Sequence, residues 1–296
     1  MNKFTVSTSA GADLDIDYIV TNNVPMIPMS YVIEEGLNVV THTHGSGSPE
    51  IGMHEFYERI STCAYARSIS IPENQFFDHF TSIYSNNNNN NNNKYILHLC
   101  LSSQVSGNFQ NARLAAYRFN QSHPDAQVIV VDTKQISHGL SLMVQDVVRL
   151  RDSGLSLEDA VKWLELNKIY YCTYLTISDP FCLRRSGRAP YLMEFLEEDL
   201  GQKPIFKVDH EGKVFPIEKY KSRKETIYRL YELFKRDMRT PATHVIIGHA
   251  NCKEDAETLR ALVEKHTTVS VEMMGPIIGI SAGPGSLAIC FNGNNR

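Results

Sequence analysis

The chain has 296 residues, more than one typical domain of roughly 100–200 residues holds, so its length favours two domains. Hydrophobic residues make up 42% and charged residues 21%, as in ordinary soluble globular proteins. The net charge of −4 argues against a nucleic-acid-binding or anionic-membrane surface, because both need concentrated Lys and Arg.

The first half alternates strand-like and helix-like patterns, which predicts a mainly parallel sheet flanked by helices. We expect strands at 4–7, within 25–33, and at 37–41, 95–101 and 127–131. We expect helices at 50–60, 73–84, 107–120, 138–151 and 157–167, the last opened by Ser156 as its N-cap. The 34–36 segment reads as a turn between two of these strands.

The second half repeats this mixture and predicts a second α/β domain. We expect strands at 170–176, 203–208, 213–216, 244–248, 269–273 and 287–291. Helices are expected within 179–200 and at 223–238 and 253–265, with a hairpin turn at 209–212. We place the domain boundary near Ile169, giving domains 1–169 and 170–296.

Cysteine usage and the lack of leader or anchor patterns bear on location. No two of the six cysteines form a C-x-x-C pair, so neither a zinc ribbon nor a redox motif is expected. The start of the chain lacks a signal-peptide pattern, and no apolar stretch approaches the ~18 residues of a membrane span. We expect a cytoplasmic protein with reduced cysteines, no metal and no stable membrane insertion.

Two conspicuous segments are expected to be solvated loops, and no function is assigned to them. The run of eight asparagines, Asn86–Asn93, has poor propensity for helix or strand, so we expect a solvated loop. The H-x-H pair of His42 and His44 binds metal only where a third ligand converges, and a solvated loop is favoured there too.

The most informative stretch is LSSQVSGNF at 101–109, where hydroxyls and a glycine lie between a buried strand and a helix. Open α/β sheets bind ligands at this position. Ser106 is a good N-cap, and the free N–H groups after it favour a carboxylate or phosphate. The alternative is that these serines only cap the helix and fill the turn.

Three further segments contain residues that could take part in catalysis or binding. His138 opens a helix, where a surface or capping role is commoner than catalysis. The 279–283 segment matches the G-x-S-x-G nucleophile elbow, but no Asp, Glu or His follows Ser281, so a glycine-rich turn is the better account. Arg184, Arg185 and Arg188 concentrate three guanidinium groups that suit docking, phosphate recognition or an ordinary charged surface.

Five segments together resemble the DegV family in order along the chain: LSSQVSGNFQNA at 101–112, the segment from Asp132 to Ser141, LRRSGRA at 183–189, Lys203 through Gly212, and GPIIGISAGPG at 275–285. The resemblance implies a two-domain α/β fold with an acyl-chain tunnel between the domains. It also implies that hydroxyls hold the fatty-acid carboxylate, which maps to Ser68 and Ser103, with Ser102 beside it. In relatives a histidine also approaches this site, and that position is Ser281 here, so the resemblance implies Ser281 as a further carboxylate-binding residue.

The same resemblance implies a carrier that buries one long-chain fatty acid and presents its carboxylate to a fatty-acid kinase subunit, which forms the acyl phosphate. Such a chain is not an enzyme and needs no cofactor beyond its bound lipid. No P-loop or G-x-G-x-x-G is present, in keeping with ATP binding by the partner. A serine hydrolase using Ser103 or Ser281 and a ligand-sensing regulator remain the alternatives.

Overall fold

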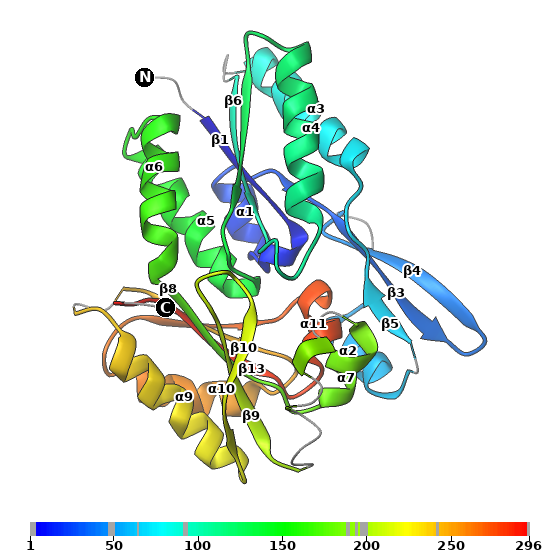
Figure 1. Cartoon of the computed structure of the whole chain (residues 1–296), viewed down its shortest axis with the longest axis vertical. Helices are drawn as coiled ribbons and strands as arrows, with labels where there is room; N and C mark the ends of the chain where they lie inside the picture. The colour runs from blue at the N-terminus through cyan, green and yellow to red at the C-terminus, as the bar shows by residue number, and fades with distance from the viewer. Residues whose placement is uncertain are drawn as a thin grey trace.

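The computed structural model describes residues 4–46, 51–63, 65–90, 94–187, 190–192, 195, 201–240 and 243–294. Its strands form a four-stranded sheet, a six-stranded sheet and a small three-stranded sheet. Figure 1 shows the first two placed one above the other along the long axis, with the third at the side. The α/β class predicted for both halves is confirmed.

The four-stranded sheet is parallel throughout, as the alternating pattern of the first half predicts. Its order is β2 (Met26–Ile27), β1 (Phe4–Ser9), β6 (Tyr95–Cys100) and β7 (Gln127–Asp132). Two helices cover each side in Figure 1: α3 (Glu73–Asn90) and α4 (Asn108–Ser122) on one, α5 (Ser137–Asp152) and α6 (Leu157–Asn167) on the other. The hydroxyl of Ser156 accepts a hydrogen bond from Asp159 N, so the predicted cap of α6 is confirmed.

The six-stranded sheet contains every strand found in the described residues of the second half. Its order is β10 (Val214–Tyr220), β9 (Lys203–Val208), β8 (Tyr171–Thr176), β13 (Leu287–Asn292), β11 (Val245–His249) and β12 (Val269–Met273). All pairs are antiparallel except β11 with β12. Helices α9 (Arg223–Asp237) and α10 (Lys253–Val263) pack on this sheet. The short η2 (Lys168–Tyr170) connects α6 to β8.

Helix α5 joins the two large sheets. It contacts β1 and β6 of the first sheet and β8, β11 and β13 of the second. Ten of its residues are buried, and its small side chains allow close approach. A Cβ on Gly139 would lie 2.5 Å from Thr173 Oγ1 of β8, so only glycine fits there. The expectation that His138 is a surface or capping residue is wrong, because its side chain is fully buried in this layer.

The three-stranded sheet was only partly predicted. A hairpin of β3 (Met29–Glu35) and β4 (Asn38–His44) turns at Gly36, whose φ is +63°, as the 34–36 segment suggests. Strand β5 (Ala66–Ser68) pairs on the other side of β3 and was not predicted. His42 and His44 lie in β4, not in a loop, and His42 stacks on Tyr31 at 5.2 Å between ring centroids. β-Branched neighbours and this packing favour the strand.

Helix α11 (Pro276–Ala282) corrects the prediction of a glycine-rich turn at 279–283. Pro276 occupies the first turn, where its fixed φ suits a helix. Ile277 and Ile280 are buried, and a Cβ on Gly279 would lie 2.6 Å from Tyr57 Oη of α2 (Met53–Thr62). Glycine therefore provides close packing within the helix here.

The asparagine run also differs from its prediction. Asn86–Asn90 form the end of α3, and residues 91–93 lie outside the described residues. Extending an existing helix costs far less free energy than nucleating a new one. The amphipathic helix that precedes the asparagines can therefore continue into them, although asparagine is a poor helix former. The short helix α1 (Ile16–Thr21), capped by Asp15, was not predicted at all.

All six cysteines are free, and five of them are buried. Cys100, Cys172 and Cys290 lie in β6, β8 and β13, as their apolar sequence context predicts. Within the described part of the chain, no helix is long and apolar enough to cross a membrane.

Candidate functional site

An apolar cavity of about 90 Å³ lies between the two large sheets and beside the small one. The first half of the chain contributes Met29, Ser68, Leu101, Val105, Ser106 and Ile136 to its lining, and the second half contributes Leu183, Val214, Ile277, Ile278 and Ser281. Most of these side chains are aliphatic. The hydroxyls of three serines are the polar groups of the lining.

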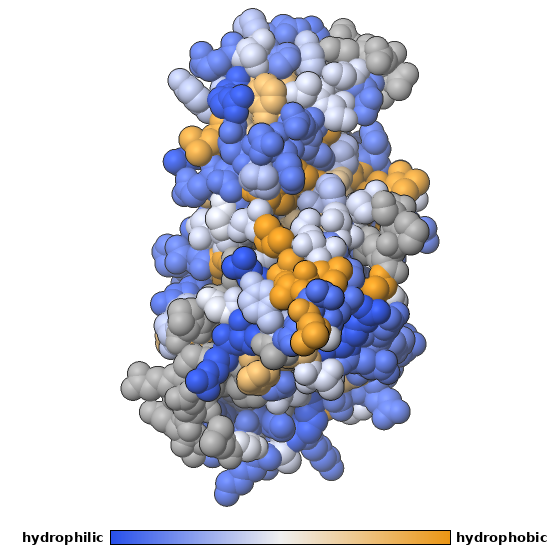
Figure 2. All heavy atoms as spheres, turned by 90° about the vertical axis from the view of Figure 1, so that its right-hand side faces the viewer, coloured by the Kyte–Doolittle hydropathy of each residue, from blue (hydrophilic) through white to orange (hydrophobic). Residues whose placement is uncertain are grey.

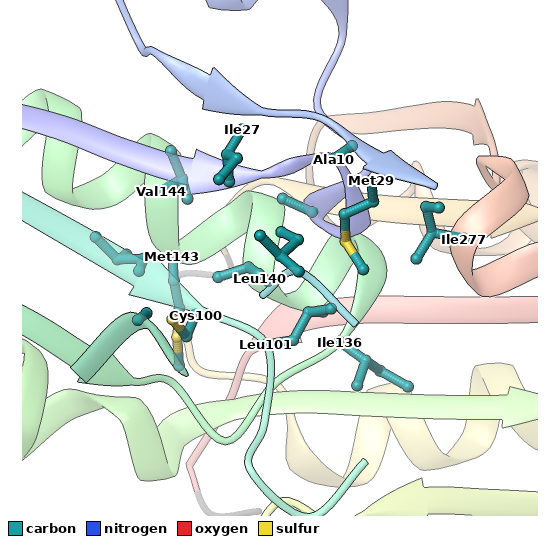
Figure 3. Packing of buried hydrophobic residues seen from close by; sticks show 14 of the residues in the cluster. Ala10, Ile27, Met29, Cys100, Leu101, Ile136, Leu140, Met143, Val144 and Ile277 are labelled. Carbon is teal, nitrogen blue, oxygen red and sulfur yellow. The ribbon is translucent and has the colours of Figure 1, made fainter. Parts of the chain in front are cut away.

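Figure 3 shows how the apolar side chains meet. Met29 and Ile277 point toward each other, and Leu101 and Ile136 approach from the loops that follow β6 and β7. Leu101 and Met29 crowd the backbone of Gly11, where a Cβ would lie 2.6 Å from Leu101 Cδ1. The hydrophobic core of the first sheet continues from Leu140 of α5 directly behind them.

Three short elements position the serines. Ser68 ends β5, Ser281 lies near the end of α11, and Ser106 precedes α4. The structure thus brings together Ser68 and Ser281, two of the residues proposed from sequence. Among the described residues none hydrogen-bonds the Ser281 side chain, which is therefore available to a ligand.

The three serines of the loop after β6 make different contacts. Ser102 is buried and its Oγ donates to Gly212 O at 2.7 Å. Ser103 Oγ accepts from Lys134 Nζ at 3.3 Å, and Ser103 is not among the described residues that line the cavity. Ser106 lines the cavity in its place.

The sequence predicts Ser106 as a helix N-cap beside N–H groups that favour an anion, but it does not single out its hydroxyl as a carboxylate ligand. Helix α4 begins at Asn108 with Gly107 at its N-cap position, one residue later than expected, although Ser106 Oγ accepts from Asn108 N at 3.3 Å. Two backbone bonds to Ser102 O, from Val105 N and Ser106 N, fold the loop into a tight turn. This turn brings Leu101, Val105 and Ser106 to the same cavity, a geometry that spacing alone does not reveal.

A polar hollow of about 360 Å³ opens beside the cavity and shares Ser68 with it. Its other lining residues are Arg67, Ile69, Ser70, Ser186 and Gly187. Ser68 therefore lies where an apolar interior meets a polar, open surface.

The three arginines proposed from sequence differ in position and contacts. Arg184 and Arg185 lie in α7 (Pro180–Ser186), and Arg188 lies outside the described residues. Arg184 is exposed. Arg185 donates to two backbone carbonyls at the end of α2, Cys63 O at 2.6 Å and Ile60 O at 2.9 Å, so it joins α7 to α2.

A buried polar group adjoins the start of α11. Ser137 Oγ donates to Asp13 Oδ2 at 2.6 Å, and burial raises the pKa of Asp13 to about 6. Burial lowers the pKa of His138 to about 3, so its ring is neutral at pH 7, with Nε2 3.7 Å from Glu272 Oε2. Three or more His, Cys, Asp or Glu side chains in metal-binding arrangement were not found in the described parts of the chain.

Comparison with known proteins decides the family. The family model described as "Uncharacterised protein, DegV family" matches residues 3–294. The chain belongs to the DegV family. A DegV domain-containing protein of Clostridium perfringens, CPE0026, is 31% identical over 205 residues, which cover 68% of this chain and 70% of the relative.

Solved DegV structures share the fold. DegV of Bacillus subtilis, described as a fatty acid binding protein, superimposes with a TM-score of 0.84 at 24% identity, covering 99% of this chain and 100% of that one. The Streptococcus pneumoniae Fatty Acid Kinase (Fak) B3 protein, loaded with linoleic acid, gives a TM-score of 0.80 at 16% identity, with 99% and 100% coverage. The resemblance to the DegV family predicted from five sequence segments is confirmed.

Proposed function

We propose that this DegV chain is a carrier that buries one long-chain fatty acid, presents its carboxylate to a kinase subunit and catalyses no reaction itself. One observation carries the proposal: an apolar cavity is rimmed by Ser68, Ser106 and Ser281 and meets a polar hollow at Ser68. Uncharged hydroxyls next to an aliphatic interior suit an acyl chain with a carboxyl end. Two structural relatives are described as a fatty acid binding protein and as the Fatty Acid Kinase (Fak) B3 protein loaded with linoleic acid.

The energetics of the cavity favour an acyl chain. Each buried CH₂ contributes about 0.8 kcal/mol, so ten of them supply about 8 kcal/mol before ordering costs. The cavity of about 90 Å³ is smaller than the roughly 300–1,000 Å³ of typical ligand sites. Met29, Leu101 and Ile136 must therefore move when a long chain enters.

The head group is proposed to lie between Ser68 and Ser281, with Ser106 as a third donor. Ser103, the remaining sequence candidate, faces Lys134, and its contribution stays a prediction. Burial raises the pKa of a carboxyl group, so the lipid binds in its protonated form where hydroxyls alone solvate it.

Partner docking is proposed at the polar hollow. Arg184 is exposed on α7, whose Ser186 lines that hollow, so its guanidinium is placed to meet a kinase subunit or an incoming phosphate. We propose that Arg185 instead holds α7 in place, because its donors already serve the end of α2. Supply of ATP by the partner implies a cytoplasmic location and a chain without a cofactor of its own.

A serine hydrolase finds no support in the site. The described lining of the cavity contains no His, Asp or Glu that would activate Ser281 as a nucleophile. Covalent labelling by a serine-directed phosphonate would revive that alternative.

The deciding experiment is native mass spectrometry of the undelipidated protein, followed by extraction and identification of any bound lipid. We expect one fatty acid per chain. Changing both Ser68 and Ser281 to Ala should abolish retention, and Ser103→Ala tests the remaining sequence candidate. The matched control is Ser122→Ala, which removes an exposed hydroxyl of α4 outside the cavity lining. A wild-type chain that stays empty after incubation with C14–C18 acids would overturn the proposal.

A further inference from the structure

In the described parts of the chain, the outer edge of strand β4 has no strand paired to it. In the three-stranded sheet β3 lies between β4 and β5, and no described residue pairs with the other edge of β4. Figure 1 shows the β3–β4 hairpin projecting from the body of the molecule with β4 outermost. Alternate residues of an edge strand direct their N–H and C=O groups away from the sheet, so this edge presents a row of backbone donors and acceptors.

This edge carries none of the usual protection against pairing. Natural edge strands are shielded by Lys, Pro, inward-pointing charges or β-bulges. The seven residues of β4, NVVTHTH, include no Lys, Arg, Asp, Glu or Pro. Its pairing with β3 runs unbroken from Asn38 to His44, without a bulge. Val39, Thr41 and Thr43 are exposed.

We propose that β4 pairs antiparallel with β4 of a second copy of this chain, about a twofold axis at Thr41, joining two three-stranded sheets into one of six strands. Only this register pairs all seven residues, and it places Thr41 opposite Thr41 of the second copy and Val39 opposite Thr43. A twofold contact uses the same patch on both copies, so that patch must be self-complementary.

The chemistry of β4 meets that requirement. β-Branched and Thr–Thr pairs across strands are favourable, whereas like charges directly opposite are destabilising. In this register His42 lies opposite Val40 and His44 opposite Asn38 of the second copy, so no two charged side chains lie directly opposite each other. The acidic residues of the hairpin, Glu34 and Glu35, belong to β3, one strand away from the new edge.

Exposed apolar side chains adjoin the same edge. Leu37 at the hairpin turn is fully exposed and Val39 is 57% exposed. Figure 2, which views the side on which the hairpin projects, shows apolar atoms gathered on an otherwise mostly hydrophilic face. In the proposed register Leu37 reaches the segment that follows His44 of the second copy. An interface of one strand pair is small, so we expect a weak, concentration-dependent dimer.

Sedimentation of the wild-type chain over a wide concentration range tests the association. Thr41→Lys places two like charges opposite each other and should raise the dimer dissociation constant at least tenfold. The matched control is Thr258→Lys, an exposed threonine on α10, which should leave dimerisation unchanged. Thermal unfolding of both variants shows whether each remains folded.

Cross-linking tests the register. Thr41→Cys should be joined to its counterpart by a short bis-methanethiosulfonate reagent, since residues directly opposite have Cβ atoms about 5 Å apart. Thr43→Cys should not, because its counterparts would be four residues apart, about 13 Å along the strand. The wild-type chain controls for Cys252, the one native cysteine that is not fully buried.

Two outcomes would overturn the proposal. A chain that remains monomeric at every concentration would show that β4 has no second-copy partner, whether or not an added kinase subunit slows hydrogen exchange at β4. A dimer that is insensitive to Thr41→Lys and is not cross-linked through Thr41→Cys would use a different surface. Neither outcome bears on lipid binding, which the native mass measurement decides separately.

Discussion

Ser102 Oγ donates a 2.7 Å hydrogen bond to the backbone carbonyl of Gly212, and this contact joins the loop after β6 to the β9–β10 hairpin. The two residues belong to different halves of the chain. Gly212 has a φ of +84°, and a Cβ there would lie 2.2 Å from Ser102 Oγ and 2.8 Å from Lys134 Cα. The loop that carries the predicted ligand-binding serines is thus held by a turn of the second half.

Gly212→Ala should therefore destabilise the protein more than backbone strain alone does. A non-glycine residue at positive φ costs about 1–2 kcal/mol, and the overlap with Ser102 and Lys134 adds to this. Gly36→Ala is the matched control, since Gly36 has a φ of +63° with open space around it. Denaturant unfolding of the two variants compares them; equal losses of stability would argue against a tight contact at Gly212.

Replacing Ser281 by histidine should change the pH dependence of lipid binding. An imidazolium donates a charge-assisted hydrogen bond to a carboxylate, worth about 1.5–3 kcal/mol, so affinity should rise roughly tenfold or more below the histidine pKa. The wild-type chain lacks that group and binds the protonated acid, so its affinity should fall steadily as pH rises from 5 to 8. A fluorescent fatty-acid displacement assay between pH 5 and 8 measures both. Identical profiles would place the head group away from α11.

The cavity lining should control acyl-chain length. Ile277→Trp adds bulk to a cavity of about 90 Å³ and should weaken binding of long chains at least tenfold. Met29→Ala removes a side chain from the same cavity and should shift the preference toward longer chains. Competition among acids of graded length, read by mass spectrometry, distinguishes the two. Unchanged selectivity in both variants would move the acyl chain elsewhere.

Arg185 should act in stability and Arg184 in partner function. Arg185→Lys keeps the charge but a lysine cannot reach Cys63 O and Ile60 O with the same planar fork, so we expect a loss of about 1–2 kcal/mol. Arg184→Ala, on the exposed side of α7, should change stability by less than about 0.5 kcal/mol. Kinase-supported phosphorylation should fall only for Arg184→Ala. The reverse pattern would exchange the two roles.

The first half should lose stability in acid because of a buried histidine pair. Ser7 Oγ lies 2.8 Å from His79 Nε2 and 2.9 Å from His98 Nδ1. Burial lowers the pKa of His79 to about 4 from its usual 6.5, and lowers that of His98 well below its usual range. As pH falls below 6.5, these histidines become protonated in the unfolded chain but stay neutral in the folded chain. The free energy of unfolding therefore decreases on acidification.

For His79 alone this decline amounts to about 3 kcal/mol between pH 6.5 and pH 4. His79→Gln should flatten the slope of unfolding free energy against pH over that range. His210→Gln, at an exposed histidine of the β9–β10 turn, removes no buried ring and serves as the control. A slope that is equally steep in His79→Gln would mean that other groups govern acid unfolding.

Much of the fold follows from local pattern. The parallel strands of the first sheet, helices α4, α5, α9 and α10, and the β3–β4 and β9–β10 hairpins follow from apolar periodicity and turn residues. Helix α11 did not, because its glycines signal a turn locally, whereas burial of Ile277 and Ile280 and contact with Tyr57 make a helix favourable.

The candidate site, like the fold, depends partly on local sequence pattern and partly on tertiary packing. The sequence by itself determined the family, through five segments that resemble it. It also determined the two-part α/β architecture and which loops end at a sheet edge, because strand and helix periodicity and turn chemistry act over a few residues. Only the tertiary structure decided which hydroxyls of those loops share a cavity. Two backbone hydrogen bonds fold the loop so that Ser106 lines the cavity with Ser68 and Ser281. Ser103 instead hydrogen-bonds Lys134, and Ser102 hydrogen-bonds Gly212. Lys134 and Gly212 come from distant parts of the chain, so their positions beside the serines depend on tertiary packing and not on sequence spacing.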